Sequence, residues 1–320
     1  MKTIRYIFNF KIKKIFILSL IIFFSLGIIS IDAAELPALI IVYDDGYKED
    51  LELVFPIHDK YNVPAVTAVN SNYIGGSLWL DQKELHFLQS KGWEIANHGK
   101  KHAALILNSL TDKAIKGEKE ISVENSYLLE KSYDYIIFNR NKGLKEKISI
   151  QEINNQNGYS NVKIKEGLIN EYPENETYLR LSRDSVIEEI IESRLELEEM
   201  GLVIDSFVYP YNGYYSLPLE LVRKNYNAAR AGYRAGESFP EAFINQKPIE
   251  KYRLKAAEVE KNLIKESDIF KLLAEVKKEK GLLILYGHPH NENFKADRIE
   301  KIIKYALENE IRVTTFRELF

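Results

Sequence analysis

The chain has 320 residues, of which 45% are hydrophobic, and this is enough apolar material to bury a sizeable core. It carries 44 basic and 47 acidic residues, a mildly acidic balance that excludes the basic footprint of a nucleic-acid-binding protein. There is no cysteine, which excludes disulfides and thiolate metal sites, so any metal ion must be held by His, Asp or Glu.

The N-terminal residues have the layout of an export signal. Five basic residues lie within the first 14 positions, and an uncharged, mostly apolar run over 15–31 follows them. This run is at the short limit of a membrane span, and the small residues Ala33 and Ala34 come after it. We therefore expect 1–34 to be a signal peptide or signal anchor, and the protein to be secreted or anchored at the outer face of the cytoplasmic membrane. Membrane contact is expected only through an uncleaved segment, and 35–320 carries a net charge of −7.

From residue 36 onward, short apolar runs alternate with amphipathic stretches. The first of these patterns predict strands over 38–43, 65–69 and 93–96, and helices over 50–61 and 81–91. Asp81 is the expected N-cap of the second helix and Gly92 its end.

The same alternation resumes after residue 180. Helices are predicted over 185–200, 217–226, 268–280 and 295–309, and strands over 203–209, 228–231, 282–286 and 311–315. Repeated β-α units predict a parallel sheet that is either open or closed into a barrel.

The segment from about 103 to 183 breaks this rhythm. Apolar residues alternate over 148–150 and 162–164 on either side of Asn157-Gly158, which predicts a β-hairpin. We interpret the segment as a surface insertion, with a substrate-binding flap as the alternative.

Two aspartates, Asp44 and Asp45, follow the first predicted strand in the stretch IVYDDGY. His98 and His102 follow the third strand in NHGKKH, and a helical turn there would bring both imidazoles to one side. One carboxylate and two imidazoles would make a metal-binding face with open positions. Adjacent residues at a strand end point in different directions, so one aspartate could bind the ion while the other acts as a base. Asp-Gly is also common in turns, and that simpler interpretation stays open.

Four further histidines are present. His58 and His86 lie inside predicted helices, where a surface or packing role is expected. His288 and His290 follow the strand 282–286, and His288, closer to the strand end, is the better candidate for a general acid. The aromatic loop FVYPYNGY, which contains Tyr211, could direct a backbone N–H at an oxyanion, or it could be a simple turn.

These motifs resemble those of the polysaccharide deacetylases with a NodB-type domain, carbohydrate esterase family 4. VYDDGY is similar to the family's first motif, TFDDG, and GWEIANHGKKH to its second, H-[ST]-x-x-H. The resemblance covers about 36–102 and 181–320. It implies an α/β fold, an irregular, incomplete (β/α) barrel of about seven parallel strands, over 35–320 with the insertion at about 103–183.

The resemblance also implies roles for individual residues. Asp45, His98 and His102 would hold one divalent ion, zinc first, with cobalt, nickel or manganese as alternatives. Asp44 would be the general base, His288 the general acid, and the backbone N–H of Tyr211 would stabilise the oxyanion.

Two departures from the family pattern matter. YPYNG resembles a subgroup in which the third-motif arginine is missing, since Val208 occupies its position. Arg230, in NAARAG, could supply that guanidinium. The fourth motif, an Asp near a Trp that orients the acid histidine, is not recognisable.

The expected function is therefore metal-dependent removal of acetyl groups from an N-acetylated or O-acetylated polysaccharide outside the cell. One alternative is an exported glycan-binding protein with weak or no catalysis. The other is a glycoside hydrolase, which would leave the two motif histidines without a role and would place its carboxylates poorly, on adjacent residues.

Overall fold

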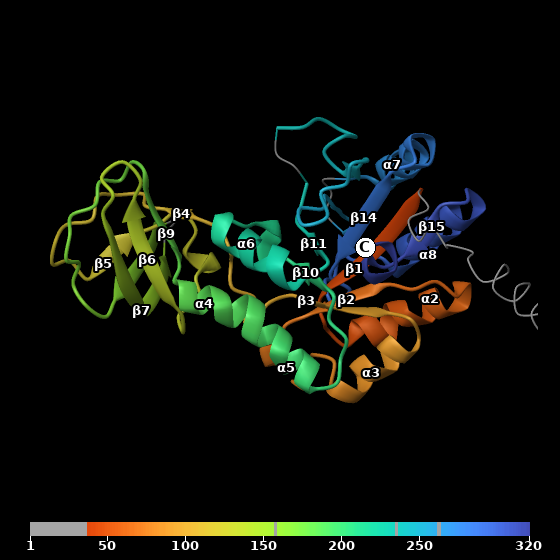
Figure 1. The fold of residues 1–320 in the computed structure, drawn as a ribbon, viewed down its shortest axis with the longest axis horizontal. Helices are drawn as coiled ribbons and strands as arrows, with labels where there is room; N and C mark the ends of the chain where they lie inside the picture. Colours follow the sequence, from red (N-terminus) through yellow and green to blue (C-terminus); the bar gives the residue numbers. More distant parts are fainter. Residues whose placement is uncertain (1–36, 157–158, 234–235, 261–263) are drawn as a thin grey trace, which may run out of the picture. The chain divides into compact units, whose positions relative to one another are not determined.

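The computed structural model describes residues 37–156, 159–233, 236–260 and 264–320 (Figure 1). The expected export signal over 1–34 and the expected turn Asn157-Gly158 lie outside these residues. None of the helices described is both long and apolar enough to cross a membrane.

The larger sheet of the described residues has nine strands, and every pairing in it is parallel except that of β12 with β14. Its strand order is β11-β10-β3-β2-β1-β14-β12, with β13 beside β14 and β15 beside β1. The strands are β1 (Ala38–Asp45), β2 (Val66–Val69), β3 (Glu94–Asn97), β10 (Ser206–Val208), β11 (Ala228–Arg230), β12 (Ile244–Asn245), β13 (Ala257–Glu258), β14 (Leu282–Gly287) and β15 (Arg312–Thr314).

One short segment joins β11, at one edge of this sheet, to β14 near the other edge, so the sheet curls into an irregular barrel. Leu254 forms a parallel bridge with Arg230 of β11, and β13, a few residues later, pairs with β14. The link consists of little more than these contacts, and the barrel is incomplete there. The α/β barrel expected from the sequence is confirmed.

Helices and helical turns connect the strands (Figure 1). They are η1 (Asp50–Val54), α2 (Phe55–Tyr61), η2 (Ser71–Tyr73), α3 (Gln82–Ser90), η3 (Ser126–Leu128), α4 (Arg183–Ile187), η4 (Glu188–Glu192), α5 (Ser193–Glu199), η5 (Pro210–Asn212), α6 (Ser216–Asn225), α7 (Glu266–Glu279), α8 (Ala296–Glu308) and α9 (Phe316–Leu319). The expected cap of α3 is present as a capping box between Asp81 and Glu84. The two helices expected over 50–61 and 185–200 each contain a π-helical turn, η1 and η4, which a regular 3.6-residue period does not predict.

The insertion forms a second sheet of six antiparallel strands in the order β4-β9-β6-β7-β8-β5. Its strands are β4 (Asn108–Ser109), β5 (Glu120–Ser122), β6 (Asp134–Asn139), β7 (Lys145–Gln156), β8 (Tyr159–Ile164) and β9 (Thr177–Leu181). The pairing of β7 with β8 confirms the expected hairpin. The other four strands are short or amphipathic and were not predicted.

Alternate residues of the barrel strands point into the barrel and form an apolar cluster of their own. On β1 this inner row is Ala38, Ile40 and Val42, and Ala68, Ala96, Ala228 and Tyr286 occupy the inner row on neighbouring strands. Side chains alternate along a strand, so the residue two positions after the last inner apolar residue also points inward. On each strand this position lies at the carboxyl end of the barrel.

Candidate active site

The inward position that follows the apolar rows is polar on five strands. The residues that lie two positions after the last inner apolar residue of each strand are Asp44, Asn70, His98, Arg230 and His288. Asp44, Asn70, His98 and Arg230 are buried, and His288 is partly buried. A fold that places polar groups in one layer above an apolar interior must give them partners or a ligand.

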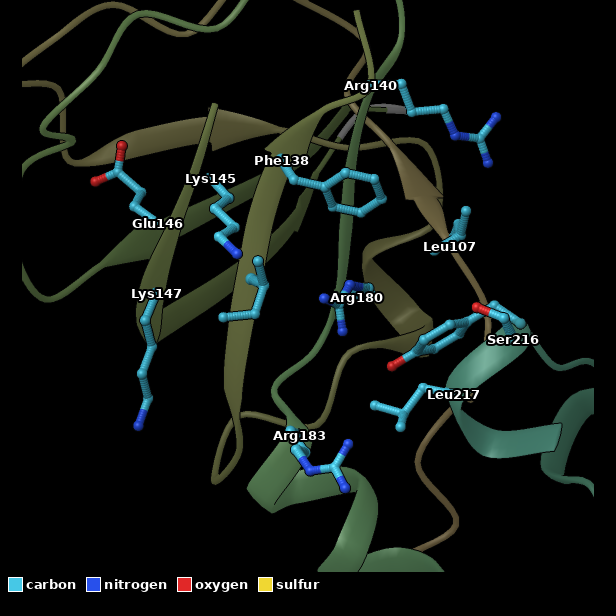
Figure 2. Close-up of a pocket in the computed structure, with 12 residues that line it drawn as sticks. Leu107, Phe138, Arg140, Lys145, Glu146, Lys147, Arg180, Arg183, Ser216 and Leu217 are labelled. Atoms are coloured by element: carbon cyan, nitrogen blue, oxygen red, sulfur yellow. The ribbon is translucent and has the colours of Figure 1, made fainter. Parts of the chain in front are cut away.

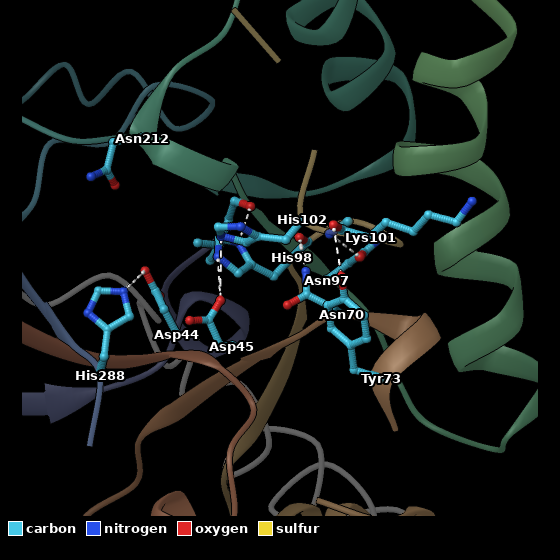
Figure 3. A network of polar contacts seen from close by, with 12 residues as sticks. Asp44, Asp45, Asn70, Tyr73, Asn97, His98, Lys101, His102, Asn212 and His288 are labelled. Carbon is cyan, nitrogen blue, oxygen red and sulfur yellow. Dashed lines mark hydrogen bonds and ion pairs between the residues drawn. The ribbon is translucent and has the colours of Figure 1, made fainter. Parts of the chain in front are cut away.

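Asp45, His98 and His102 come together beside this layer (Figure 3). The Nε2 atoms of His98 and His102 lie 3.6 and 3.4 Å from Oδ1 of Asp45, and the candidate ligand atoms are all within 4.8 Å of one another. Asp45 turns away from Asp44 because its φ is +75°, a left-handed value that is uncommon outside glycine. The two aspartates therefore face different partners, as the sequence suggested.

Burial favours the neutral form of both imidazoles, which is the form that binds metals. Nδ1 of His98 donates to the carbonyl of Val208 at 2.8 Å, which leaves the lone pair of Nε2 directed at Asp45. Burial and the charge of His102 lower the pKa of His98 well below its usual range, against the opposing charge of Asp45. Burial also lowers the pKa of His102. Two imidazole nitrogens and a carboxylate oxygen that face one another are a donor set that fits a divalent ion.

The loop from His98 to His102 is not the helical turn considered from the spacing. It is irregular, with φ values of +87° at Gly99 and +59° at His102. A Cβ at Gly99 would lie 2.3 Å from Oε2 of Glu189, so only glycine allows this approach. The two imidazoles meet all the same, with ring centroids 4.7 Å apart.

Glu189, a buried carboxylate of η4, holds this loop in place. It accepts backbone N–H groups from Lys100, Lys101 and Ala103 at 3.1, 2.8 and 3.3 Å. The hydroxyl of Tyr133, from the insertion, donates to the same carboxylate at 2.6 Å. Glu189 could not be predicted from the sequence, because a glutamate on an amphipathic helix gives no sign that it is buried.

Asp44 forms a buried ion pair with Arg230. Nη2 of Arg230 lies 2.6 Å from Oδ2 of Asp44, and the Arg230 side chain is fully buried. Nη1 donates to Oδ1 of Asn212 at 2.6 Å, and the guanidinium lies 4.3 Å from the ring centroid of Tyr286. Oδ1 of Asp44 is buried without a hydrogen-bond partner among the described residues, so it is placed to accept a proton from a bound molecule. The structure thus puts a guanidinium from Arg230 against the proposed base.

His288 lies on the other side of Asp44 and is held by a second carboxylate. Its Nε2 is 3.9 Å from Oδ2 of Asp44, and its Nδ1 makes a close hydrogen bond to Oε1 of Glu260. The backbone N–H of His288 donates to the same oxygen at 3.1 Å. Glu260 is the partner that sequence reasoning missed, because it lies in AAEVEK, without the Asp and Trp expected of the fourth motif.

Glu260 keeps His288 protonated. Burial lowers the pKa of His288, but the hydrogen bond that His288 donates to Glu260 and the charge of Asp44 outweigh it and raise the pKa to about 9. Glu258, Glu260 and His288 also bring three potential ligand atoms within 4.8 Å. The Tyr286 hydroxyl donates to Oε2 of Glu258 at 3.1 Å and His288 bonds Oε1 of Glu260, whereas Oε2 of Glu260 is buried without a partner among the described residues.

The remaining three histidines lie outside this constellation. His58 is buried and contacts the Tyr43 hydroxyl at 2.8 Å, and His86 contacts the carbonyl of Met200 at 2.8 Å, in agreement with the packing roles expected. The ring of His290 stacks on Tyr47 with centroids 3.7 Å apart.

Comparison with known proteins adds an independent finding. The model of the polysaccharide deacetylase family matches residues 33–157, the part of the chain that contains both aspartates and the first two site histidines. This match covers less than half of the chain and ends within the insertion. No curated protein matches the chain.

Several solved structures resemble this chain at low identity. A T48 deacetylase with substrate has a TM-score of 0.49 at 11% identity, over 91% of this chain and 94% of that one. A family 4 acetyl xylan esterase from Clostridium thermocellum in complex with a cobalt ion has 0.45 at 14%, over 88% and 90%. A family 4 pseudoenzyme from Bacillus anthracis has 0.45 at 10%, over 88% and 64%. These low scores decide neither substrate nor mechanism.

An aromatic cleft of about 400 Å³ lies beside Asp45 and His102. Its other lining residues are Tyr47, Asn70, Tyr73, Trp79, Lys101, Ala103, Tyr127, Leu128, Leu129, Glu130 and Tyr211. Tyr127 to Glu130 belong to the insertion, which therefore forms one wall of the cleft. This favours the alternative of a substrate-binding flap over a mere surface insertion.

Tyr211 lies at this cleft, in the turn η5. Its φ is +53° and its ring centroid is 4.6 Å from that of His102. Asp45, His102 and Tyr211 all have left-handed backbones, and strain of this kind persists where the surrounding structure imposes a functional geometry. The role of the Tyr211 N–H at an oxyanion remains a prediction.

Replacing Glu260 by Gln is expected to move the alkaline limb of the pH–rate profile to lower pH. A neutral amide cannot hold the proton on His288 as the carboxylate does, and a general acid works only while protonated. We also expect kcat near neutral pH to fall by roughly 10-fold, the effect of losing one charged hydrogen bond. The measurement is kcat against pH, with the exposed Glu292→Gln as control. An unchanged alkaline limb would show that Glu260 does not tune His288.

Proposed function

We propose that the protein is an exported, divalent-metal-dependent deacetylase that removes acetyl groups from an acetylated polysaccharide. The observation that carries this proposal is that a candidate metal-binding cluster lies beside a pair of residues suited to proton transfer. The cluster Asp45-His98-His102 fits an ion, and 3.9 Å separates the carboxylate of Asp44 from the imidazole of His288. The match of residues 33–157 to the polysaccharide deacetylase family supports the reaction class.

Asp45, His98 and His102 would hold the ion, for which zinc is our first choice and cobalt, nickel and manganese are alternatives. When bound, such an ion supplies Lewis-acid polarisation and lowers the pKa of water. Two imidazoles and one carboxylate are a usual donor set for a catalytic zinc site, which keeps an open position.

The chain's own residues then supply the proton transfers. Asp44, held by its ion pair with Arg230, accepts the proton of the attacking water through its unpartnered Oδ1. His288, kept protonated by Glu260, donates a proton to the departing amine nitrogen, or to the oxygen of an ester. An amine leaves poorly unless it is protonated, so a base and a separate acid are both needed. The backbone N–H of Tyr211 would donate to the oxyanion.

The substrate is proposed to be an N-acetylated glycan, with O-acetylated glycans as the alternative. The cleft supports a sugar substrate because tyrosine and tryptophan rings line it, with Tyr73 and Trp79 stacked at 5.0 Å between centroids. The export signal expected over 1–34 would place the enzyme outside the cytoplasm, where such polymers lie.

The test is acetate release from a panel of N- and O-acetylated glycans, with and without a chelator. We expect release from at least one glycan, loss of release with the chelator, and recovery when Zn²⁺ or Co²⁺ is added back. Full activity in demetallated protein would contradict the metal dependence. Tight glycan binding without acetate release, even with metals added, would support a binding protein, and new reducing ends would support a glycoside hydrolase.

A further inference from the structure

A second hollow lies on the insertion sheet, outside the cleft that carries the chemistry. It has a volume of about 930 Å³ (Figure 2). We call it the basic groove, and its lining residues are Leu107, Ile136, Phe138, Arg140, Lys145, Glu146, Lys147, Arg180, Arg183, Tyr215, Ser216 and Leu217. One face of β6, β7 and β9 forms one wall, and the residues that lead into α6 form part of another.

Positive charge is concentrated in this groove. Residues 103–183 contain twelve basic and twelve acidic residues and are neutral as a whole. Five of those twelve cations line the groove, against one acid, Glu146. The carboxylate of Glu146 is already engaged, because it accepts the backbone N–H groups of Ile169 and Asn170 at 2.8 and 3.0 Å. The groove is therefore cationic although the insertion is not.

Three of the five cations have no carboxylate partner. Lys145, Arg180 and Arg183 take part in no ion pair within the described part of the chain. The other two are only partly neutralised at the surface, Lys147 by Asp134 and Arg140 by Glu176 across 3.9 Å.

Aromatic rings lie against two of the three arginines of the groove, Arg140 and Arg180. The guanidinium of Arg180 lies 5.6 Å from the ring centroids of both Phe138 and Tyr215, and that of Arg140 lies 4.5 Å from the ring centroid of Tyr178. A guanidinium that rests on a ring keeps its N–H edge free for bidentate binding of a carboxylate or phosphate. Because these rings already carry guanidinium groups, they are poorly available for stacking with nucleobases.

The basic groove is joined to the cleft by two short stretches of chain. Tyr215 is four residues beyond Tyr211, and Leu107 is five beyond His102. Even fully extended, four residues span at most about 14 Å. A polymer of several sugar units could therefore reach from the cleft into the groove, and the insertion lines both.

We propose that the basic groove binds anionic groups of the polysaccharide strand whose acetyl group lies in the cleft. The ligand class is an acidic polysaccharide, with carboxylate or phosphate groups on sugars that flank the reacting one. The assignment of this ligand as substrate rests on the proposed function, whereas the binding itself can be measured without catalysis.

The test is direct binding of polygalacturonate oligosaccharides to the full chain by calorimetry. Arg180→Gln with Arg183→Gln is compared with Lys163→Gln and Lys165→Gln, which remove two exposed charges from β8 and its end, outside the groove. We expect the arginine pair to weaken binding by at least about 10-fold, since each contributes a charged hydrogen bond, and the lysine pair to leave it within about 2-fold. Arg183→Gln alone is a second variant, because Arg180 also packs on rings. Matching unfolding midpoints show that each variant is folded.

Further ligands test whether binding depends on the negative charge of the polysaccharide. Methyl-esterified polygalacturonate has the same backbone without charge, and we expect it to bind weakly. A phosphate-bearing glycan distinguishes the two anions. Equal binding by both variant pairs, no binding by the unmodified protein, or tighter arginine-dependent binding of single-stranded DNA would overturn the proposal.

Acetate release from a short neutral N-acetylated oligosaccharide should be the same in both variant pairs, because such a short oligosaccharide does not reach the groove. If that release is absent while polygalacturonate still binds, the proposed function fails and the groove stands as a binding site. If release is present without anion binding, only the groove proposal fails.

Discussion

Asp44→Asn is expected to lower kcat for acetate release by about 10³-fold without loss of the bound ion. The amide keeps the shape of the side chain but cannot accept a proton, and general-base catalysis contributes roughly 10²- to 10⁴-fold. The three residues proposed to hold the ion are unchanged in this variant. The measurements are kcat and the metal content of the purified protein.

The control for this experiment is Asp59→Asn, an exposed aspartate on α2 that is expected to have normal activity. Retention of more than about a tenth of the activity would show that Asp44 is not the base, given the size of the effect expected of one. Loss of the metal together with the activity would instead show that Asp44, and not only Asp45, is a ligand.

Arg230→Ala is expected to lower kcat by at least about 10²-fold and to destabilise the fold by about 3–5 kcal/mol. Both effects follow from the burial of the pair, since removing one partner leaves the carboxylate of Asp44 desolvated without a counter-charge. An unpaired buried carboxylate tends to take up a proton, and protonated Asp44 is no base. Acetate release and urea unfolding measure the two effects.

A pair of variants separates catalysis from stability. Arg230→Lys keeps the charge, but its ammonium lacks the fork that reaches Asp44 and Asn212 together, so activity should stay low while stability recovers in part. Asp44→Asn combined with Arg230→Met removes both charges, and we expect it to be more stable than Arg230→Ala. Turnover of Arg230→Ala near that of the unmodified protein would show that this arginine does not support the base.

The strands that carry the site could be predicted because each is a short apolar run followed by polar residues. The inner rows of β1, β3, β11 and β14 lead, two residues later, to Asp44, His98, Arg230 and His288. Period-two alternation is a local property, so the sequence alone indicates these positions. Of the three proposed metal ligands only His98 lies on such a row, whereas Asp45 is the last residue of β1 and His102 lies in the polar stretch that follows β3. The link of Arg230 to Asp44 was expected from the family resemblance.

What could not be predicted depends on contacts between distant segments. The sheet of the insertion is made of strands as short as the two-residue β4, whose pairing depends on neighbours far along the chain. Glu260 and Glu189 are single acids without a motif, and only their burial against His288 and the 98–102 loop gives them a role. The π-helical turns η1 and η4 are departures from the very period used to predict helices.

The bond between Tyr133 and Glu189 has a consequence for anyone who wishes to engineer a minimal enzyme from this chain. Deleting the insertion would remove the Tyr133 hydroxyl that donates to Glu189. The carboxylate of Glu189 also binds the backbone of the 100–103 loop, and His102 lies in that loop. A shortened protein would need another hydrogen-bond donor to Glu189 if His102 is to keep its position beside Asp45 and His98. The two parts of the chain are thus a single unit of design, although one of them contributes no proposed ligand, base or acid.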